Sequence, residues 1–116
     1  MADIYRELHR MLKPLCRHCA AVEYHFDGSL PEELIIYYIV DKTATAHFSN
    51  RRRRIRYQIG VDLLQRDGEK LDSTEDNVIT ALEAKGYHWT DNDPDAYIKD
   101  TGHYKRTLNF YYYTEV

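Results

Sequence analysis

Residues 53–64, RRIRYQIGVDLL, decide the fold because they show the clearest two-residue alternation in the chain. One set of alternate positions is apolar: Ile55, Tyr57, Ile59, Val61 and Leu63. The positions between them are polar or small: Arg56, Gln58, Gly60 and Asp62. This period predicts a β-strand with one face in the core and one face half-exposed. Gly60 predicts a bulge or a close backbone approach within that strand.

Two strands and a helix are expected before this segment. Residues 34–40, LIIYYIV, are apolar on both faces and predict a central strand, and the small polar residues 43–50 predict a loop or a fraying strand end. Residues 20–26 predict an earlier strand that closes on the turn pair Asp27-Gly28. Residues 3–13 predict a helix with one apolar stripe, capped by Asp3 and ended by Pro14.

A second helix and an aromatic ending follow it. Residues 73–85 predict a helix with a capping box made by Asp72 and Glu75, and with Gly86 at the C′ position. Residues 87–89 and 97–98 flank the acidic turn TDNDPD, and residues 105–114 predict a last strand. The order is α-β-β-β-α-β-β. It predicts an α+β fold, a mostly antiparallel sheet of about five strands with two helices packed on one face.

The totals fit one domain that spans residues 1–116. Two domains would each be too small to bury an adequate core at this length of 116 residues. A formal charge of -3 excludes a general polycation. No apolar run approaches the roughly 20 residues that cross a bilayer, and the N-terminus lacks the apolar stretch of a signal peptide. We therefore expect a cytosolic chain with no membrane partner.

Arginine and tyrosine provide the candidate interaction residues. The basic run contains Arg51, Arg52, Arg53, Arg54 and Arg56, and it predicts either a solvated strand edge or a contact with phosphate or with an acidic partner. Tyr111, Tyr112 and Tyr113 alternate faces along the last strand, so at most half of them reach the core beside Phe110. Tyr111 and Tyr113 are the candidates for a subunit contact surface.

Chemistry has little support in the sequence. Cys16 and Cys19 form a C-x-x-C pair that follows a helix end, and no second pair completes a tetrahedral zinc site. Two ordinary thiols are the favoured interpretation, and a metal or redox role is the alternative. Asp91, Asp93 and Asp95 have the spacing of a calcium loop but lack its glycine and its final glutamate, which favours a polar turn. We expect no enzyme activity and no cofactor.

Taken end to end, the layout resembles the tail terminator and tail-completion proteins of long-tailed bacteriophages, which include head-to-tail joining proteins. The resemblance rests on the order of DIYRELHRMLKPL, LIIYYIV, TATAHFSN, RIRYQIGVDLL and STEDNVITALEAKG. It closes on the aromatic-acidic segment YHWTDNDPDAYIKDTGHYKRTLNFYYYTEV.

This resemblance implies a structural virion protein of the tail and neck, assembled in the bacterial cytoplasm. Its copies would form a ring, commonly a hexamer, that ends tail-tube polymerisation and joins the tail to the head. The implied partners are the tail tube protein, the head connector proteins and the DNA that passes through the ring. The alternative is a small nucleic-acid-binding module that uses Arg51 to Arg56 and exposed tyrosines. A small enzyme or toxin is a third hypothesis, and no residue group supports it.

Overall fold

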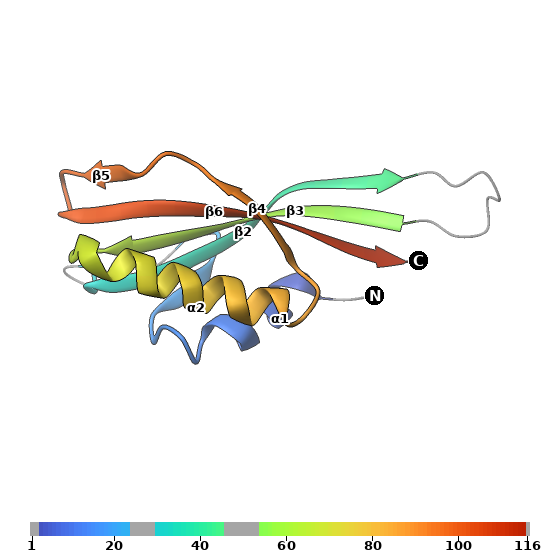
Figure 1. Ribbon diagram of the computed structural model, residues 1–116, viewed down its shortest axis with the longest axis horizontal. Helices are drawn as coiled ribbons and strands as arrows, with labels where there is room; N and C mark the ends of the chain where they lie inside the picture. Colours follow the sequence, from blue (N-terminus) through green and yellow to red (C-terminus); the bar gives the residue numbers. More distant parts are fainter. Residues whose placement is uncertain (1–2, 24–29, 46–53, 116) are drawn as a thin grey trace.

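The protein is an α+β domain in which two helices lie on one face of a mixed six-stranded sheet (Figure 1). The computed structural model describes residues 3–23, 30–45 and 54–115. Its elements, in chain order, are α1 (Ile4–Leu12), β1 (Cys19–Ala21), β2 (Glu33–Thr45), β3 (Arg54–Gln65), the 3-10 turn η1 (Gly68–Lys70), α2 (Leu71–Glu83), β4 (His88–Asn92), β5 (Ala96–Ile98) and β6 (His103–Glu115). The predicted fold class and the placement of both helices on one face are confirmed.

The sheet has the strand order β1-β2-β3-β6-β4, with β5 also paired to β6. The β1–β2 pairing is parallel, and the pairings of β2 with β3 and of β6 with β3, β4 and β5 are antiparallel. The predicted order was one strand short after the second helix. The acidic turn does not close a hairpin, because β4 and β5 both pair with β6 and not with each other. Pro94 lacks a backbone N–H donor and lies in the irregular stretch between them.

Helix α1 begins where the sequence predicts it. The Asp3 side chain accepts a hydrogen bond from the Arg6 backbone N–H at 3.1 Å, which caps the first turn. Ile4, Leu8 and Leu12 are buried along one stripe. The Tyr5 hydroxyl also accepts the backbone N–H of Ile39 in β2 at 3.1 Å, so α1 covers part of the edge of the sheet.

Helix α2 begins two residues earlier than predicted, and the predicted capping box is wrong. Asp67 caps η1 by accepting from the Glu69 N–H at 3.1 Å, and Lys70 at the start of α2 provides no side-chain cap. The helix also ends two residues earlier than predicted, at Glu83, but Gly86 has the left-handed backbone that its predicted place after the helix requires. Gly86 has φ +91, and the N–H groups of Gly86 and Tyr87 donate to the carbonyls of Glu83 and Leu82 at 3.1 Å each.

The first predicted strand is shorter than expected. β1 covers Cys19–Ala21 and then stops, because Val22 has a φ of 68 and the Glu23 N–H donates back to the Ala21 carbonyl at 2.7 Å. A β-branched residue with positive φ cannot continue a ladder. Residues 24–26 of the predicted strand lie outside the described residues.

The two long strands β2 and β3 form the centre of the sheet. Leu34 and Ile35 are both 1% exposed, which confirms that β2 is covered on both faces at its start. β2 continues to Thr45, beyond its predicted end at Val40, and residues 46–50 lie outside the described residues. In β3, Gly60 allows a close approach, because a Cβ there would lie 2.6 Å from Cζ of Tyr38. The close neighbour is a side chain, and the pairing of β3 is regular at Gly60, so Gly60 marks neither of the two predicted features, a bulge or a close backbone approach.

Strands β2, β3 and β6 run on past the ends of both helices (Figure 1). We define the arm as residues 41–45, 54–58 and 111–115, which pair in register across these three strands. The arm begins beside one row of paired residues, Ile39, Ile59, Phe110 and Trp89. The two outer strands of this row are irregular here, with Val40 outside the ladder in β2 and Thr90 outside it in β4.

Candidate functional site

The arm carries arginine and tyrosine side chains stacked on one another. Arg54 Cζ lies 5.1 Å from the ring centroid of Tyr113, and Arg56 Cζ lies 4.9 Å from that of Tyr111. Each stack joins β3 to β6, which are neighbours in the sheet. We name these four residues the arginine–tyrosine face. Cation–π contacts at exposed sites contribute about 0.5–1 kcal/mol each, so the stacks hold the guanidinium groups in place.

This face lies on the side of the sheet away from the helices. Residues paired directly across strands share a face. Phe110 pairs with Ile59 and both are fully buried under the helices, so Tyr111 and Tyr113 point the other way. Tyr113 is 40% exposed and Tyr111 is half-buried.

The predicted alternation of the three tyrosines is confirmed. Tyr112 packs on the helix side, stacked on the buried Tyr87 with ring centroids 4.1 Å apart and 12° between the planes. Arg56 lies on the outward face of β3, as predicted, and Arg54 lies on the same face of the arm. Arg51, Arg52 and Arg53 lie outside the described residues. The roles of these residues in partner or DNA contact remain predictions.

A half-buried carboxylate braces the same side of the sheet. Asp62 Oδ1 accepts hydrogen bonds from the Tyr38 hydroxyl at 2.9 Å and the Thr107 hydroxyl at 2.7 Å. Burial, together with the nearby Asp62 charge, raises the pKa of Tyr38 well above its usual range. These hydrogen bonds connect β2, β3 and β6 in the part of the sheet next to the arm. Sequence periodicity assigned Asp62 to the half-exposed face but gave no sign of its partners.

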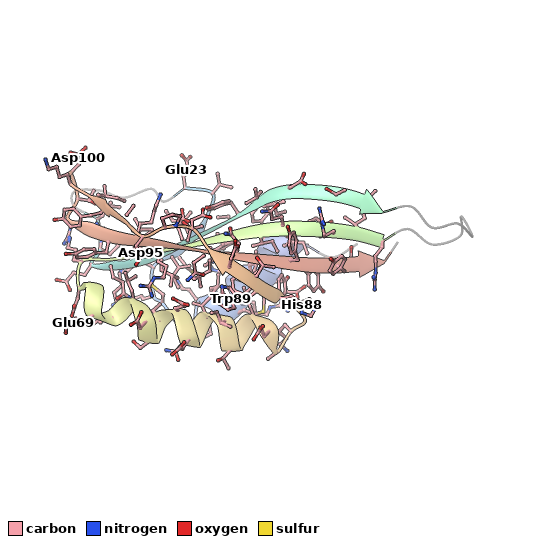
Figure 2. All side chains as sticks on the ribbon, turned by 45° about the horizontal axis from the view of Figure 1, so that its top comes forward. Glu23, Glu69, His88, Trp89, Asp95 and Asp100 are labelled. Carbon is pink, nitrogen blue, oxygen red and sulfur yellow. The ribbon has the colours of Figure 1, made fainter. Side chains whose placement is uncertain are left out.

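An acidic edge lies beyond β6, on and between β4 and β5. We define it as Asp91, Asp93 and Asp95, and Figure 2 labels Asp95. The Asn109 amide donates to Asp91 Oδ1 at 3.1 Å and to Asp93 Oδ1 at 3.0 Å. The predicted polar turn is therefore part of an outer edge of the sheet, held to β6 by side-chain hydrogen bonds.

Asp95 belongs to an ion-pair cluster around Arg106. The Arg106 guanidinium donates to both carboxylate oxygens of Asp95, at 3.0 and 2.9 Å, and to Asp72 and Glu75 at 2.7 Å each. The hydrogen bond from Arg106 holds the pKa of Asp95 below its usual range. Because the Arg106 side chain is only 16% exposed and makes four charged contacts, we interpret it as a structural clamp between α2, β6 and the acidic edge.

The two thiols are separate and buried. The Cys16 thiol donates to the His18 carbonyl at 3.3 Å, and Cys19 Sγ lies 3.7 Å from Nδ1 of His9. The same His9 nitrogen lies 2.7 Å from the Tyr37 hydroxyl. Burial raises the pKa of both thiols, which favours the protonated and unreactive form at neutral pH. Among the described residues, no group of three or more His, Cys, Asp or Glu side chains is placed to hold a metal ion.

The outer surface of α1 carries shallow hollows. One is lined by Arg6, His9, Arg10, Lys13 and Pro14, and another lies between α1 and α2.

Neither helix of the described chain is long and apolar enough to cross a membrane. No family model matches the chain, and no curated protein matches it either.

Proposed function

We propose that this chain is a self-assembling structural subunit of the tail-terminator type, which forms a ring at the end of a phage tail tube. The observation that carries the proposal is the arm. Its three strands extend past the helix layer and present stacked aromatic and cationic side chains to the outside. Large exposed aromatic rings beside arginine are typical of subunit contact surfaces.

The layout of the molecule suits a ring. Its principal-axis extents are 52 × 26 × 23 Å, so the domain is long and narrow. Neighbouring copies in a ring of more than two subunits meet through two different surfaces of the same chain. The arm lies at one end of the sheet and the acidic edge lies along its side, which provides two such surfaces. The order of elements along the sequence supports the terminator type within the broader class of ring subunits.

The proposed ring stands in the neck of the virion. It would stop polymerisation of the tail tube protein, dock the head connector proteins and let DNA pass. In this proposal it is a homo-oligomer of six copies, assembled in the bacterial cytoplasm, and it uses no cofactor and performs no catalysis.

The proposal is tested by assembling particles without this chain and then supplying it. Electron microscopy should show unjoined heads and tails of irregular length without the chain, and joined particles once it is added. Replacement of Arg51 to Arg54 by Ser should lower the yield of joined particles, whereas Arg10→Ser with Lys99→Ser should leave it unchanged. Joined particles of normal length in the absence of the chain would refute the proposal.

A second function, binding of single-stranded nucleic acid, is favoured by one observation. The arginine run and the tyrosine run belong to segments far apart in the sequence, yet β3 and β6 place Arg54 and Arg56 on Tyr113 and Tyr111. Such a surface can contact phosphates and stack bases. The test is binding of short labelled oligonucleotides at several salt concentrations. Tight binding that weakens steeply with salt, and that is lost in Arg54→Ser with Arg56→Ser, would support this function.

A further inference from the structure

We infer that the edge of β2 in the arm binds the same edge of a second copy, so that the two sheets join into one. We define the open edge as the side of Lys42, Thr43 and Ala44 that faces away from β3. The two copies run antiparallel, and a twofold axis passes between their Thr43 residues. This contact goes beyond the proposed function, because it uses neither the arginine–tyrosine face nor the acidic edge.

The outer edge of β2 is covered as far as Ile39. The Ile35 N–H donates to the His18 carbonyl beside β1 at 2.9 Å, and the Ile39 N–H donates to the Tyr5 hydroxyl of α1 at 3.1 Å. Alternate residues of a strand direct their backbone groups to the same side, so this series of residues faces away from β3. The body of the protein therefore provides hydrogen-bond partners for the edge up to this point.

The edge continues without such partners in the arm. Lys42 and Ala44 pair with the residues two and four positions before Ile59, which itself pairs with Ile39. Because bonded and non-bonded pairs alternate along an antiparallel ladder, Lys42 and Ala44 direct their N–H and C=O groups away from β3, as Ile39 does. No hydrogen bond from the described residues reaches these groups. They form a short template for an added strand.

The neighbouring side chains leave the open edge uncovered. The Lys42 ammonium lies 5.7 Å from the ring centroid of Tyr57 on β3, so this side chain lies back over its own sheet. The Thr43 hydroxyl donates to the Asp41 carboxylate at 2.8 Å, which holds that carboxylate along β2. Ala44 has only a methyl group. Charged side chains usually protect a sheet edge from a second strand, and here both charges are held within their own sheet.

The open edge is complementary to itself in one register. With Thr43 opposite the Thr43 of the second copy, Lys42 of each copy lies opposite Ala44 of the other. These outward residues form two hydrogen-bonded pairs, with two N–H···O=C bonds in each pair. The two Thr43 side chains meet in the non-bonded pair between them, where threonine pairs are favourable. No two like charges lie directly opposite each other within the open edge.

The shape of the molecule permits this approach. The three arm strands extend past both helices, so an antiparallel second copy places its helices at the opposite end of the joined sheet (Figure 1). The contact is isologous and closes on itself, so it produces a dimer and not a chain. It involves β2, whereas the arginine–tyrosine face lies on β3 and β6.

Hydrogen exchange of the wild-type protein tests the open edge directly. At low concentration the Lys42 and Ala44 amides should exchange fast and the Thr43 amide slowly, because only Thr43 donates within its own sheet. At high concentration light scattering should show a dimer, and the Lys42 and Ala44 amides should then exchange at least about tenfold more slowly. Exchange rates that do not depend on concentration would overturn the inference.

Proline provides the variant test. Ala44→Pro removes an N–H that faces away from β3, and proline is tolerated at such edge positions. It should keep the urea midpoint of the wild type and weaken dimerisation about thirtyfold, since each dimer loses two hydrogen bonds. The controls are Ala44→Ser, which keeps the N–H, and Lys99→Pro, which places proline in an exposed turn. Both controls should dimerise like the wild type. Normal dimerisation of Ala44→Pro, or a large fall in its urea midpoint, would contradict the assigned edge.

A cysteine at the twofold axis tests the register. A non-bonded antiparallel pair brings two Cα atoms to about 4.5 Å, which is within the range of a disulfide. Thr43→Cys with oxidised glutathione should therefore give a disulfide-linked dimer, whereas Thr80→Cys on the exposed surface of α2 should not. Equal cross-linking of the two variants would refute the register.

The dimer and the proposed function fail separately. Ala44→Pro should still restore joined particles, because the ring surfaces lie on other strands. A wild-type protein that stays monomeric at every concentration overturns the dimer, and the particle-joining assay then still decides the proposed function. Loss of particle joining in Ala44→Pro would show that the edge of β2 serves the particle itself, which overturns a contact separate from the ring.

Discussion

Replacement of Gly60 by alanine should destabilise the protein, because the new methyl group would meet the ring of Tyr38. The added Cβ would lie 2.6 Å from Cζ and 2.8 Å from the hydroxyl oxygen. The ring has little freedom to yield, since its hydroxyl donates to Asp62 at 2.9 Å. Overpacking of this kind costs about 1–3 kcal/mol, and loss of the hydrogen bond costs about 1 kcal/mol.

Part of that cost is offset in the unfolded chain. Alanine restricts the unfolded backbone, which stabilises the folded state by about 0.5–1 kcal/mol. The expected net loss in the free energy of unfolding is therefore about 2 kcal/mol, which corresponds to a fall in Tm of roughly 8 °C for a domain of this size. Urea unfolding followed by circular dichroism measures it.

The cause is isolated by repeating Gly60→Ala in a Tyr38→Val background, where no ring atoms remain to be displaced. There the same change should be neutral or should stabilise by up to about 1 kcal/mol. A Gly60→Ala protein with the urea midpoint of the wild type would refute the reasoning, because the close approach would then impose no constraint on β3.

Three further predictions concern the ion pair, the tyrosine alternation and the thiols. Arg106 lowers the pKa of Asp95 in the folded state, so the ion pair contributes stability above the usual pKa of 3.8. This contribution disappears as the pH falls through the lower pKa of the folded state. Urea midpoints measured against pH should therefore fall less steeply for Asp95→Asn than for the wild type. Tyr112→Ala should lower the free energy of unfolding by about 2 kcal/mol, because it removes the stack on Tyr87. Tyr113→Ala should lower it by only about 0.5 kcal/mol. Equal urea midpoints for the two variants would contradict the assigned faces. Both cysteine thiols should react with a disulfide reagent far more slowly in the folded protein than in urea, and equal rates would show that burial does not protect them.

Features set by local sequence could be predicted, and these include most of the elements. The alternation in residues 53–64 predicted β3 because burial of one sheet face leaves a two-residue period in the chain. Asp3 and Gly86 marked helix ends because their roles depend on backbone groups within a few residues. The alternation of Tyr111, Tyr112 and Tyr113 predicted their faces for the same reason.

Features set by distant residues could not be predicted. Asp72 fits a capping box locally, but its carboxylate contacts Arg106, 34 residues away in the sequence. The parallel direction of β1 and the shared pairing of β4 and β5 with β6 depend on strand order, which no local pattern encodes.

The same reason explains the candidate site. The chain places β6 between β3 and β4, and this non-sequential order brings the arginines onto the tyrosines. The residues themselves were identified from the sequence, but their stacking required knowledge of which strands are neighbours.

The arm begins at the row of paired residues Ile39, Ile59, Phe110 and Trp89. The direction of the arm depends on how many residues each strand has at this row, and not on the chemistry of their side chains. Val40 and Thr90 stand outside the ladders on its two sides, and an extra residue in one strand bends that strand and increases its twist. Removal of either residue would leave every later side chain on its present face, because the residues on the two sides of each bulge already pair with consecutive residues of the neighbouring strand. A change of one residue in length at this joint would therefore re-aim the arm, and with it the angle between neighbouring copies in an assembly, while both contact surfaces keep their composition.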